Sequence, residues 1–218
     1  MISSTVENYL KELFLLDQNG NKQIATGELA SSLNVTPGSA TSMIKTLAQA
    51  GLVVHRPHYG VTLTSSGRNL AIHVVRRHRI VELFLVKILG MGWSEVHDEA
   101  EQLEHVVSDE VISRMDELLG HPTIDPHGEP IPSSDGYLLT RALQLLSFCK
   151  QGECVSIARI GDQDTSFLKF AEDNGLMLGA VVEVTNRNET ANSITIRTDN
   201  KELVLGLAAA GRIEVEDA

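Results

Sequence analysis

The stretch IATGELASSLNVTPGSATSMIKTLAQAGLVV, residues 24–54, has the pattern of two short helices joined by a tight turn. Thr26 can cap the first helix, and Thr36 and Pro37 fit the cap and the first position of the second. Apolar residues then recur at helical spacing between residues 40 and 48, until a glycine stops the helix. This pattern predicts a helix-turn-helix.

The chain that follows predicts a β-wing. LVVHRPHYGVTLT, residues 52–64, has two short runs with strand character joined by a turn. The outward residues of the second helix are small or form hydrogen bonds, as a helix that enters the major groove requires. A solvated polar face would look similar, but the wing favours DNA binding. The candidate DNA-binding residues are Thr26, Thr36, Pro37, Ser39, Thr41, Ser42, Lys45, Arg56 and His58.

Helical patterns continue around this module, and a change of pattern follows. An amphipathic helix is expected at residues 5–16, a long one at 65–89, and another from Ser94 to Gly120. The segment 121–136 holds four of the six prolines and predicts a linker. Short strand-like runs then alternate with turns and predict a small barrel of SH3 type.

The predicted fold is therefore mainly α with a C-terminal β module. We expect a winged helix-turn-helix domain at 1–70, a helical domain at 71–140 and an SH3-like domain at 141–218. Long helices beside a winged helix-turn-helix commonly form a two-fold dimer that presents paired recognition helices to DNA. A homodimer bound to double-stranded DNA is the expected assembly.

Composition limits the compartment and the partners. The N-terminus lacks a cleavage-site pattern and no window approaches a membrane span, so we expect a cytoplasmic protein without a membrane partner. Cys149 and Cys154 are expected to be reduced thiols.

Charge is unevenly distributed along the chain, whose formal net charge is −11. Residues 1–70 hold five Lys and Arg against four Asp and Glu, residues 71–150 seven against thirteen, and residues 151–218 six against twelve. The first segment can approach a phosphate backbone, whereas the acid-rich remainder needs a cation to offset repulsion. A bound divalent metal is one candidate.

Ligand-type side chains gather in VHDEAEQLEHVVSDE, residues 96–110. On a helix, four of them share one narrow sector: His97, Glu101, Glu104 and His105. The preceding helix carries His78 and Glu82 one turn apart. Imidazole and carboxylate without thiolate suit Mn²⁺ or Fe²⁺, with Zn²⁺ and Co²⁺ as competitors. Alternatively, neighbouring arginines pair with these acids as an ordinary charged surface.

Several motifs together resemble one known family. They are the wing GLVVHRPHYGVTLTSSGR at 51–68, HRIVE at 78–82, VHDEAEQLEHVVSDEV at 96–111 and HPTIDPHGEPIP at 121–132. The chain is similar along its whole length to the diphtheria-toxin-repressor and manganese-transport-regulator family of metal-dependent transcriptional repressors. Residues 146–216 resemble the SH3-like module of the longer members, which also occurs in ferrous-iron-transport accessory proteins. The resemblance implies a repressor that controls metal-ion homeostasis.

The resemblance also implies two metal sites. The regulatory site would use Asn8, Glu101, Glu104 and His105, and the second site His78, Glu82, His97 and an acid of the SH3-like domain, either Asp164 or Asp162, with Asp164 preferred. Glu101 stands where the iron-responsive branch has cysteine, which favours Mn²⁺ over Fe²⁺. Asn8 stands where the manganese branch usually has aspartate and the iron branch methionine.

Two rival functions differ in class. One is a winged-helix regulator that responds to a small organic ligand in its dimer core. The other is a metalloenzyme, since histidines and carboxylates can also hold a catalytic metal. The sequence carries no second set of candidate acids, bases or nucleophiles, no phosphate loop and no G-x-S-x-G motif. We therefore expect neither an enzyme nor a small organic substrate.

Overall fold

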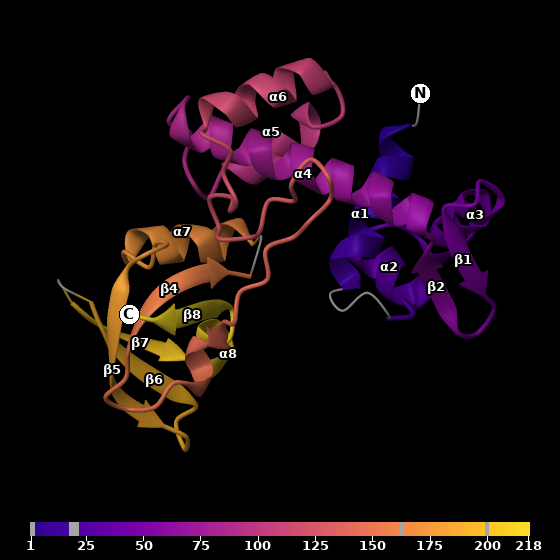
Figure 1. Ribbon diagram of the computed structural model, residues 1–218. Helices are drawn as coiled ribbons and strands as arrows, with labels where there is room; N and C mark the ends of the chain where they lie inside the picture. Colours follow the sequence, from indigo (N-terminus) through magenta and orange to yellow (C-terminus); the bar gives the residue numbers. More distant parts are fainter. Residues whose placement is uncertain (1–2, 18–21, 162–163, 199–200) are drawn as a thin grey trace. The chain divides into compact units, whose positions relative to one another are not determined.

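The computed structural model describes residues 3–17, 22–161, 164–198 and 201–218. The chain divides into two compact units (Figure 1). The first comprises Met1–Arg77 and Pro132–Tyr137, and the second His78–Ile131 and Leu138–Ala218. The division falls within the long helix α4 (Ser65–Lys87), which contributes residues to both.

Three helices and a hairpin precede α4 in the first unit. They are α1 (Ser4–Leu16), α2 (Thr26–Ser32), α3 (Pro37–Gln49), β1 (Val53–Arg56) and β2 (Gly60–Leu63). As predicted, Thr36 caps α3 by accepting a hydrogen bond from the backbone N–H of Ser39, and Pro37 is its first residue. Thr26 differs from expectation, since it begins α2 inside the helix and Ala25 occupies the cap position.

The core of this unit holds α2 and α3 against α1 and the hairpin. Leu10, Leu29, Ile44 and Leu47 are almost fully buried in it. The hairpin is antiparallel, with Val53 opposite Leu63, and it confirms the predicted wing. It is joined to the segment before α2 by mutual hydrogen bonds between Ile24 and Val61.

The second unit contains the C-terminal part of α4 together with α5 (Val96–Leu103) and α6 (Asp109–Leu118). A single helix was expected from Ser94 to Gly120, but the helix ends at Leu103 and a new one begins at Asp109. The Ser108 side chain accepts a hydrogen bond from the N–H of Val111 and so starts α6. Glu95, and not Ser94, occupies the cap position of α5.

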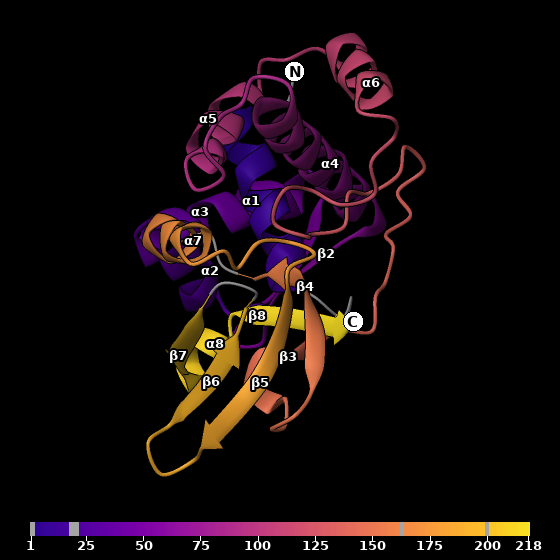
Figure 2. The ribbon, with the colours of Figure 1, turned by 90° about the vertical axis from the view of Figure 1, so that its left-hand side faces the viewer.

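The β module of the second unit is a six-stranded antiparallel sheet in the order β3-β8-β4-β5-β6-β7 (Figure 2). This architecture confirms the expected C-terminal β module on a mainly helical chain. Its elements are β3 (Gln144–Leu145), the 3-10 turn η1 (Leu146–Phe148), β4 (Cys154–Ile160), α7 (Thr165–Asp173), β5 (Val181–Asn188), β6 (Ser193–Arg197), β7 (Glu202–Gly206), α8 (Leu207–Ala210) and β8 (Ile213–Asp217).

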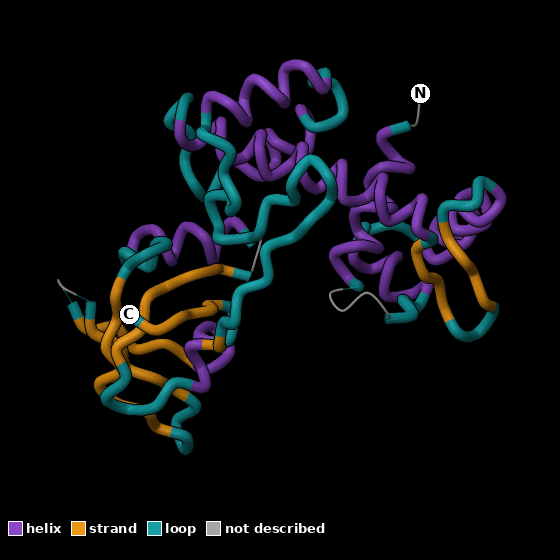
Figure 3. The backbone as a smooth tube through the Cα atoms, viewed as in Figure 1, coloured by secondary structure: helices purple, strands orange, loops and turns teal. Residues whose placement is uncertain are grey.

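The core of the β module includes a side chain from the segment that precedes α5. Trp93, which precedes α5, is buried with Leu168, Ile157 and Val215 in one apolar cluster. The chain between α6 and β3 is loop (Figure 3), yet residues 125–128 are buried. Among the described helices, none is long and apolar enough to span a membrane.

Candidate metal centre and nucleic-acid interface

The exposed side of α3 carries most of the residues predicted to contact DNA. Ser39, Ser42 and Lys45 are exposed on it, as are Thr36 and Pro37 at its start. The half-buried Thr41 donates its hydroxyl hydrogen to the carbonyl of Pro37, 2.7 Å away, so this group is already engaged by its own helix. Thr26 is half-buried at the start of α2. This face suits a DNA groove, since its exposed side chains are small, polar or positively charged.

The hairpin presents its charged residues at one end. Arg56 ends β1, and His58 lies in the connecting turn with a φ of 67°. Both side chains are exposed. Tyr59 is 73% exposed in the same turn and was not among the predicted residues, although an aromatic residue in a turn is a signal that could have indicated it. The wing thus offers cationic and aromatic groups together.

The first cluster of ligand-type side chains joins α4 to α5. His78 and Glu82, one turn apart on α4, bring Nε2 and Oε1 within 3.0 Å. His97 of α5 lies on the same carboxylate, with Nδ1 3.1 Å from Glu82 Oε1. The rings of His78 and His97 meet edge to face at 4.9 Å. The expected i, i+4 pair of α4 and the histidine of α5 are therefore in contact.

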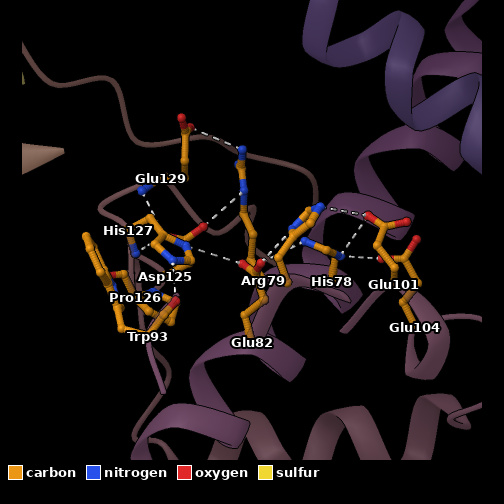
Figure 4. A network of polar contacts seen from close by, with 11 residues as sticks. His78, Arg79, Glu82, Trp93, Glu101, Glu104, Asp125, Pro126, His127 and Glu129 are labelled. Carbon is orange, nitrogen blue, oxygen red and sulfur yellow. Dashed lines mark hydrogen bonds and ion pairs between the residues drawn. The ribbon is translucent and has the colours of Figure 1, made fainter. Parts of the chain in front are cut away.

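The second cluster lies on the other side of the His78 ring (Figure 4). His78 Nδ1 is 2.5 Å from Glu104 Oε2 and 3.5 Å from Glu101 Oε1. His105 Nε2 lies 3.4 Å from Glu104 Oε1. One oxygen or nitrogen from each of Glu101, Glu104 and His105 falls within 4.8 Å of the others, as metal ligands require. His78 therefore stands between the two clusters.

A third cluster contains two residues that the sequence analysis did not single out. Asp125 and His127, from the segment predicted to be a linker, lie beside Glu82, and all three are buried. Burial and the nearby Glu82 raise the pKa of Asp125 to about 7, although Arg79 opposes the change. Burial also lowers the pKa of His127, against the attraction of Glu82. The sequence signal that could have indicated this cluster is the pair of ligand-type residues, an acid and a histidine, on either side of Pro126.

The pKa of the Glu82 carboxyl is shifted in opposite directions by its burial and by the neighbouring histidines. Its burial by itself raises the carboxyl pKa, but His78 and His97 attract the ionised form and hold the pKa below its usual range. A cation binds a carboxylate in its ionised form, and it binds an imidazole only through a ring nitrogen that carries no proton.

The remaining two predicted ligands belong to other elements, α1 and the start of α7. Asn8 is on α1 in the first unit, where its side-chain oxygen is shielded from solvent and accepts no hydrogen bond from the described part of the chain. Asp164 is an exposed residue that caps α7, with Oδ1 2.9 Å from the N–H of Ser166. It belongs to none of the three clusters found among the described residues, and Asp162 lies outside those residues.

Comparison with known proteins matches three segments of the chain to known domains. The N-terminal DNA-binding domain of iron-dependent repressors matches residues 1–61, their metal-binding and dimerisation domain matches 64–133, and the FeoA domain matches 144–217. The diphtheria toxin repressor of Corynebacterium glutamicum is 31% identical over 220 residues, which cover 96% of this chain and 96% of the relative. The chain belongs to the iron-dependent repressor family. It is a metal-responsive, DNA-binding repressor, and members of the family are transcriptional repressors rather than enzymes.

Solved structures of this family are similar along the whole chain. A manganese-dependent transcriptional repressor in complex with manganese is 40% identical, with a TM-score of 0.89, and the match covers 98% of this chain and all of that one. ScaR with bound Cd²⁺ is 34% identical, with a TM-score of 0.81, over 98% and 99% of the two chains.

Proposed function

We propose that this repressor responds to Mn²⁺, with Fe²⁺ as the alternative effector, and that the ion binds within the clusters around His78. One observation carries the proposal: the two nitrogens of His78 face Glu82 and Glu104, which links the first and second clusters into one buried set of donors. The donors are imidazole nitrogens and carboxylate oxygens, which suit a hard or borderline divalent ion. Both cysteines lie in the β module, so thiolate is not among the donors of these clusters.

Two sites are proposed. The regulatory site would use Glu101, Glu104 and His105 together with Asn8, and the second His78, Glu82, His97 and Asp164. The second cluster supports the regulatory site, and the first cluster supports the other site. The shielded Asn8 oxygen fits a ligand role because a buried oxygen without a hydrogen bond is costly unless something binds it. The places of Asn8 and Asp164 remain predictions.

The bound ion would regulate DNA binding by linking two parts of the chain. Asn8 belongs to the unit that carries the winged helix, and Glu104 to the other unit. A cation held by both favours the arrangement of a homodimer in which paired recognition helices fit successive major grooves. To convert a largely inactive dimer into a largely active one, the ions must favour the active state by about 5.5 kcal/mol. The ion also offsets repulsion between the acidic remainder of the chain and phosphate.

A titration of the chelator-stripped chain with Mn²⁺ tests this proposal. DNA binding is measured with and without Mn²⁺ on a duplex selected from random sequence in the presence of the ion. Glu104→Ala should abolish stimulation by Mn²⁺, because it removes a carboxylate at the junction of both clusters. Glu117→Ala, an exposed acid on α6, serves as the matched control.

The outcomes separate the candidate functions. Unchanged stimulation in Glu104→Ala would remove this residue from the switch. Tight DNA binding by the stripped chain, unaffected by Mn²⁺ or anaerobic Fe²⁺, would favour a winged-helix regulator that responds to a small organic ligand.

A further inference from the structure

The wing ends in a turn whose backbone is held in one conformation. The N–H of Tyr59 donates to the carbonyl of Arg56 at 3.0 Å, so Pro57 and His58 occupy the two central positions of the turn. Proline fixes a negative φ at the first of these positions, and His58 has a φ of 67° at the second, which is the pattern of a type II turn. The tip of the wing therefore needs little further ordering when it binds a partner.

The strands of the wing are fixed to the rest of the first unit. Gly60 has a φ of 120°, and a Cβ at this position would lie 2.6 Å from the carbonyl oxygen of Ile24. Ile24 and Val61 exchange backbone hydrogen bonds of 3.0 and 2.9 Å. The other strand, β1, packs against α3 (Figure 1). The wing therefore has a defined place beside the helix that carries most of the predicted DNA contacts.

The side chains at the tip are exposed and unengaged. Tyr59 is 73% exposed, and Arg56 and His58 are exposed beside it. Within the described ranges of the chain, these three side chains make no hydrogen bond, ion pair or ring contact. A tyrosine and an arginine that lie together on a fixed backbone form the combination most common at the centres of binding surfaces. The tip therefore has the properties of a contact surface.

The charge of the surrounding sequence favours a polyanion as the partner. Residues 29–81 contain no Asp or Glu, although the whole chain has 29 of them. The same segment contains six Lys and Arg. It includes α3, the wing and most of α4. A chain with a net charge of −11 thus keeps its acids out of the segment that carries the wing, which reduces repulsion of phosphate there.

The length of the wing matches the distance between neighbouring grooves of DNA. Strands β1 and β2 have four residues each. At about 3.3 Å per residue they extend about 13 Å, and the turn adds to this reach. One turn of B-DNA is about 34 Å long, so the centre of a minor groove lies about 17 Å from the centre of the major groove beside it. When α3 lies in a major groove, the tip can therefore reach the adjacent minor groove.

We propose that Tyr59 enters this minor groove and selects A·T over G·C base pairs there. An A·T pair in either orientation presents only hydrogen-bond acceptors in the minor groove, whereas a G·C pair adds the amino group of guanine. The Tyr59 hydroxyl can donate to these acceptors, and the guanine amino group would obstruct it. Arg56 would lie against the flanking phosphate, where the narrow groove of A·T-rich DNA strengthens the attraction. The inference goes beyond the proposed function, because it concerns DNA recognition whichever ion is the effector.

Three duplexes test the proposal. A duplex is first selected from random sequence by the full wild-type chain in the presence of Mn²⁺. The base pairs about five positions to either side of the centre of each half-site are then made A·T, G·C or inosine·cytosine. Inosine·cytosine has the major-groove pattern of G·C but lacks the amino group in the minor groove, so it separates readout in the two grooves. Fluorescence anisotropy measures the affinity for each duplex.

The wild type should bind the A·T and inosine·cytosine duplexes equally and the G·C duplex at least about fivefold more weakly. Tyr59→Ala should abolish this difference, and Tyr59→Phe, which lacks only the hydroxyl, should reduce it. Tyr137→Ala is the matched control, because Tyr137 is a second tyrosine of the first unit and is 66% exposed. It should retain the full difference between the duplexes.

Three results would overturn the proposal: no difference between the duplexes in the wild type, a difference that persists in Tyr59→Ala, or an inosine·cytosine duplex that binds as weakly as the G·C duplex. Each of them leaves the proposed function intact, because stimulation by Mn²⁺ is measured separately on the A·T duplex. If Mn²⁺ does not stimulate binding, the same duplexes are selected and compared with anaerobic Fe²⁺ or with the stripped chain, whichever binds DNA. The two proposals can therefore fail independently.

Discussion

Replacing Arg79 with methionine should destabilise the second unit strongly. The guanidinium is 9% exposed, donates to the Pro130 carbonyl at 2.5 Å, and lies 3.6 Å from the buried Asp125 carboxylate. Methionine has similar length but leaves Asp125 without this counter-charge. Breaking a buried ion pair by removing one partner costs about 3–5 kcal/mol. We expect a loss approaching that size in the unfolding free energy of the metal-free chain at pH 8, where the Asp125 carboxyl, whose pKa is about 7, is mostly ionised in the wild type, and a smaller loss at lower pH, where it is protonated.

A second substitution separates the cost of the unpaired charge from the cost of the broken hydrogen bonds. In Arg79→Met combined with Asp125→Asn, the uncompensated charge is gone and only hydrogen bonds remain broken, which costs about 1–3 kcal/mol. The double variant should therefore be more stable than Arg79→Met alone by roughly 2 kcal/mol. Arg114→Met is the control, because Arg114 is 75% exposed and pairs with a Glu110 that is 70% exposed. It should change stability by no more than about 0.5 kcal/mol.

Urea unfolding measures these differences. Trp93 is the single tryptophan of the chain, and its indole N–H donates to the Pro126 carbonyl beside Asp125, so its fluorescence reports on this loop. The reasoning would be refuted if Arg79→Met lost no more stability than Arg114→Met, or if the double variant were no more stable than Arg79→Met.

Three further changes have defined outcomes. At pH 8 a thiol reagent should modify the exposed Cys154 quickly and the buried Cys149 only after unfolding. The reason is that burial raises the pKa of Cys149 to about 11, which leaves on the order of 0.1% of this thiol as thiolate. Two rapidly modified thiols per native chain would contradict this prediction. Gly128→Ala should lower the unfolding temperature far more than Gly175→Ala, because both have positive φ but only Gly128 would place its Cβ against backbone; equal shifts would argue against the close packing of the turn. Lys45→Ala should weaken DNA binding and reduce the salt slope by about one unit while Mn²⁺ affinity is retained, and an unaltered slope would place the recognition helix elsewhere.

Features that depend on neighbouring residues were predicted well. Thr36 and Pro37 are specific to a helix start, and they mark the observed start of α3. The spacing of His78 and Glu82 predicted that both side chains would lie together, and they are 3.0 Å apart. Such features depend on residues within one turn of helix, so the sequence is sufficient to place them.

Two other features were not predicted: a break in a helix, and a set of contacts between residues far apart in the sequence. Helical periodicity continues through residues 104–108, but the capping hydrogen bond of Ser108 starts a separate helix there. Proline content indicated a linker around Asp125 and His127, whereas these residues are buried by contacts with Glu82 and Trp93, more than 30 positions away. Neither helical periodicity nor composition indicates which distant residues contact each other.

The position of His78 between Glu82 and Glu104 also governs how substitutions in this region combine. One ring is held by a carboxylate on each nitrogen, at 3.0 and 2.5 Å. Loss of either carboxylate releases the ring from the orientation that serves the other. The loss of Mn²⁺ binding free energy in the double variant of Glu82→Gln and Glu104→Gln should therefore be smaller than the sum of the losses in the two single variants. The two clusters are therefore energetically coupled, so a substitution in one cluster should weaken Mn²⁺ binding less when the other cluster already carries a substitution.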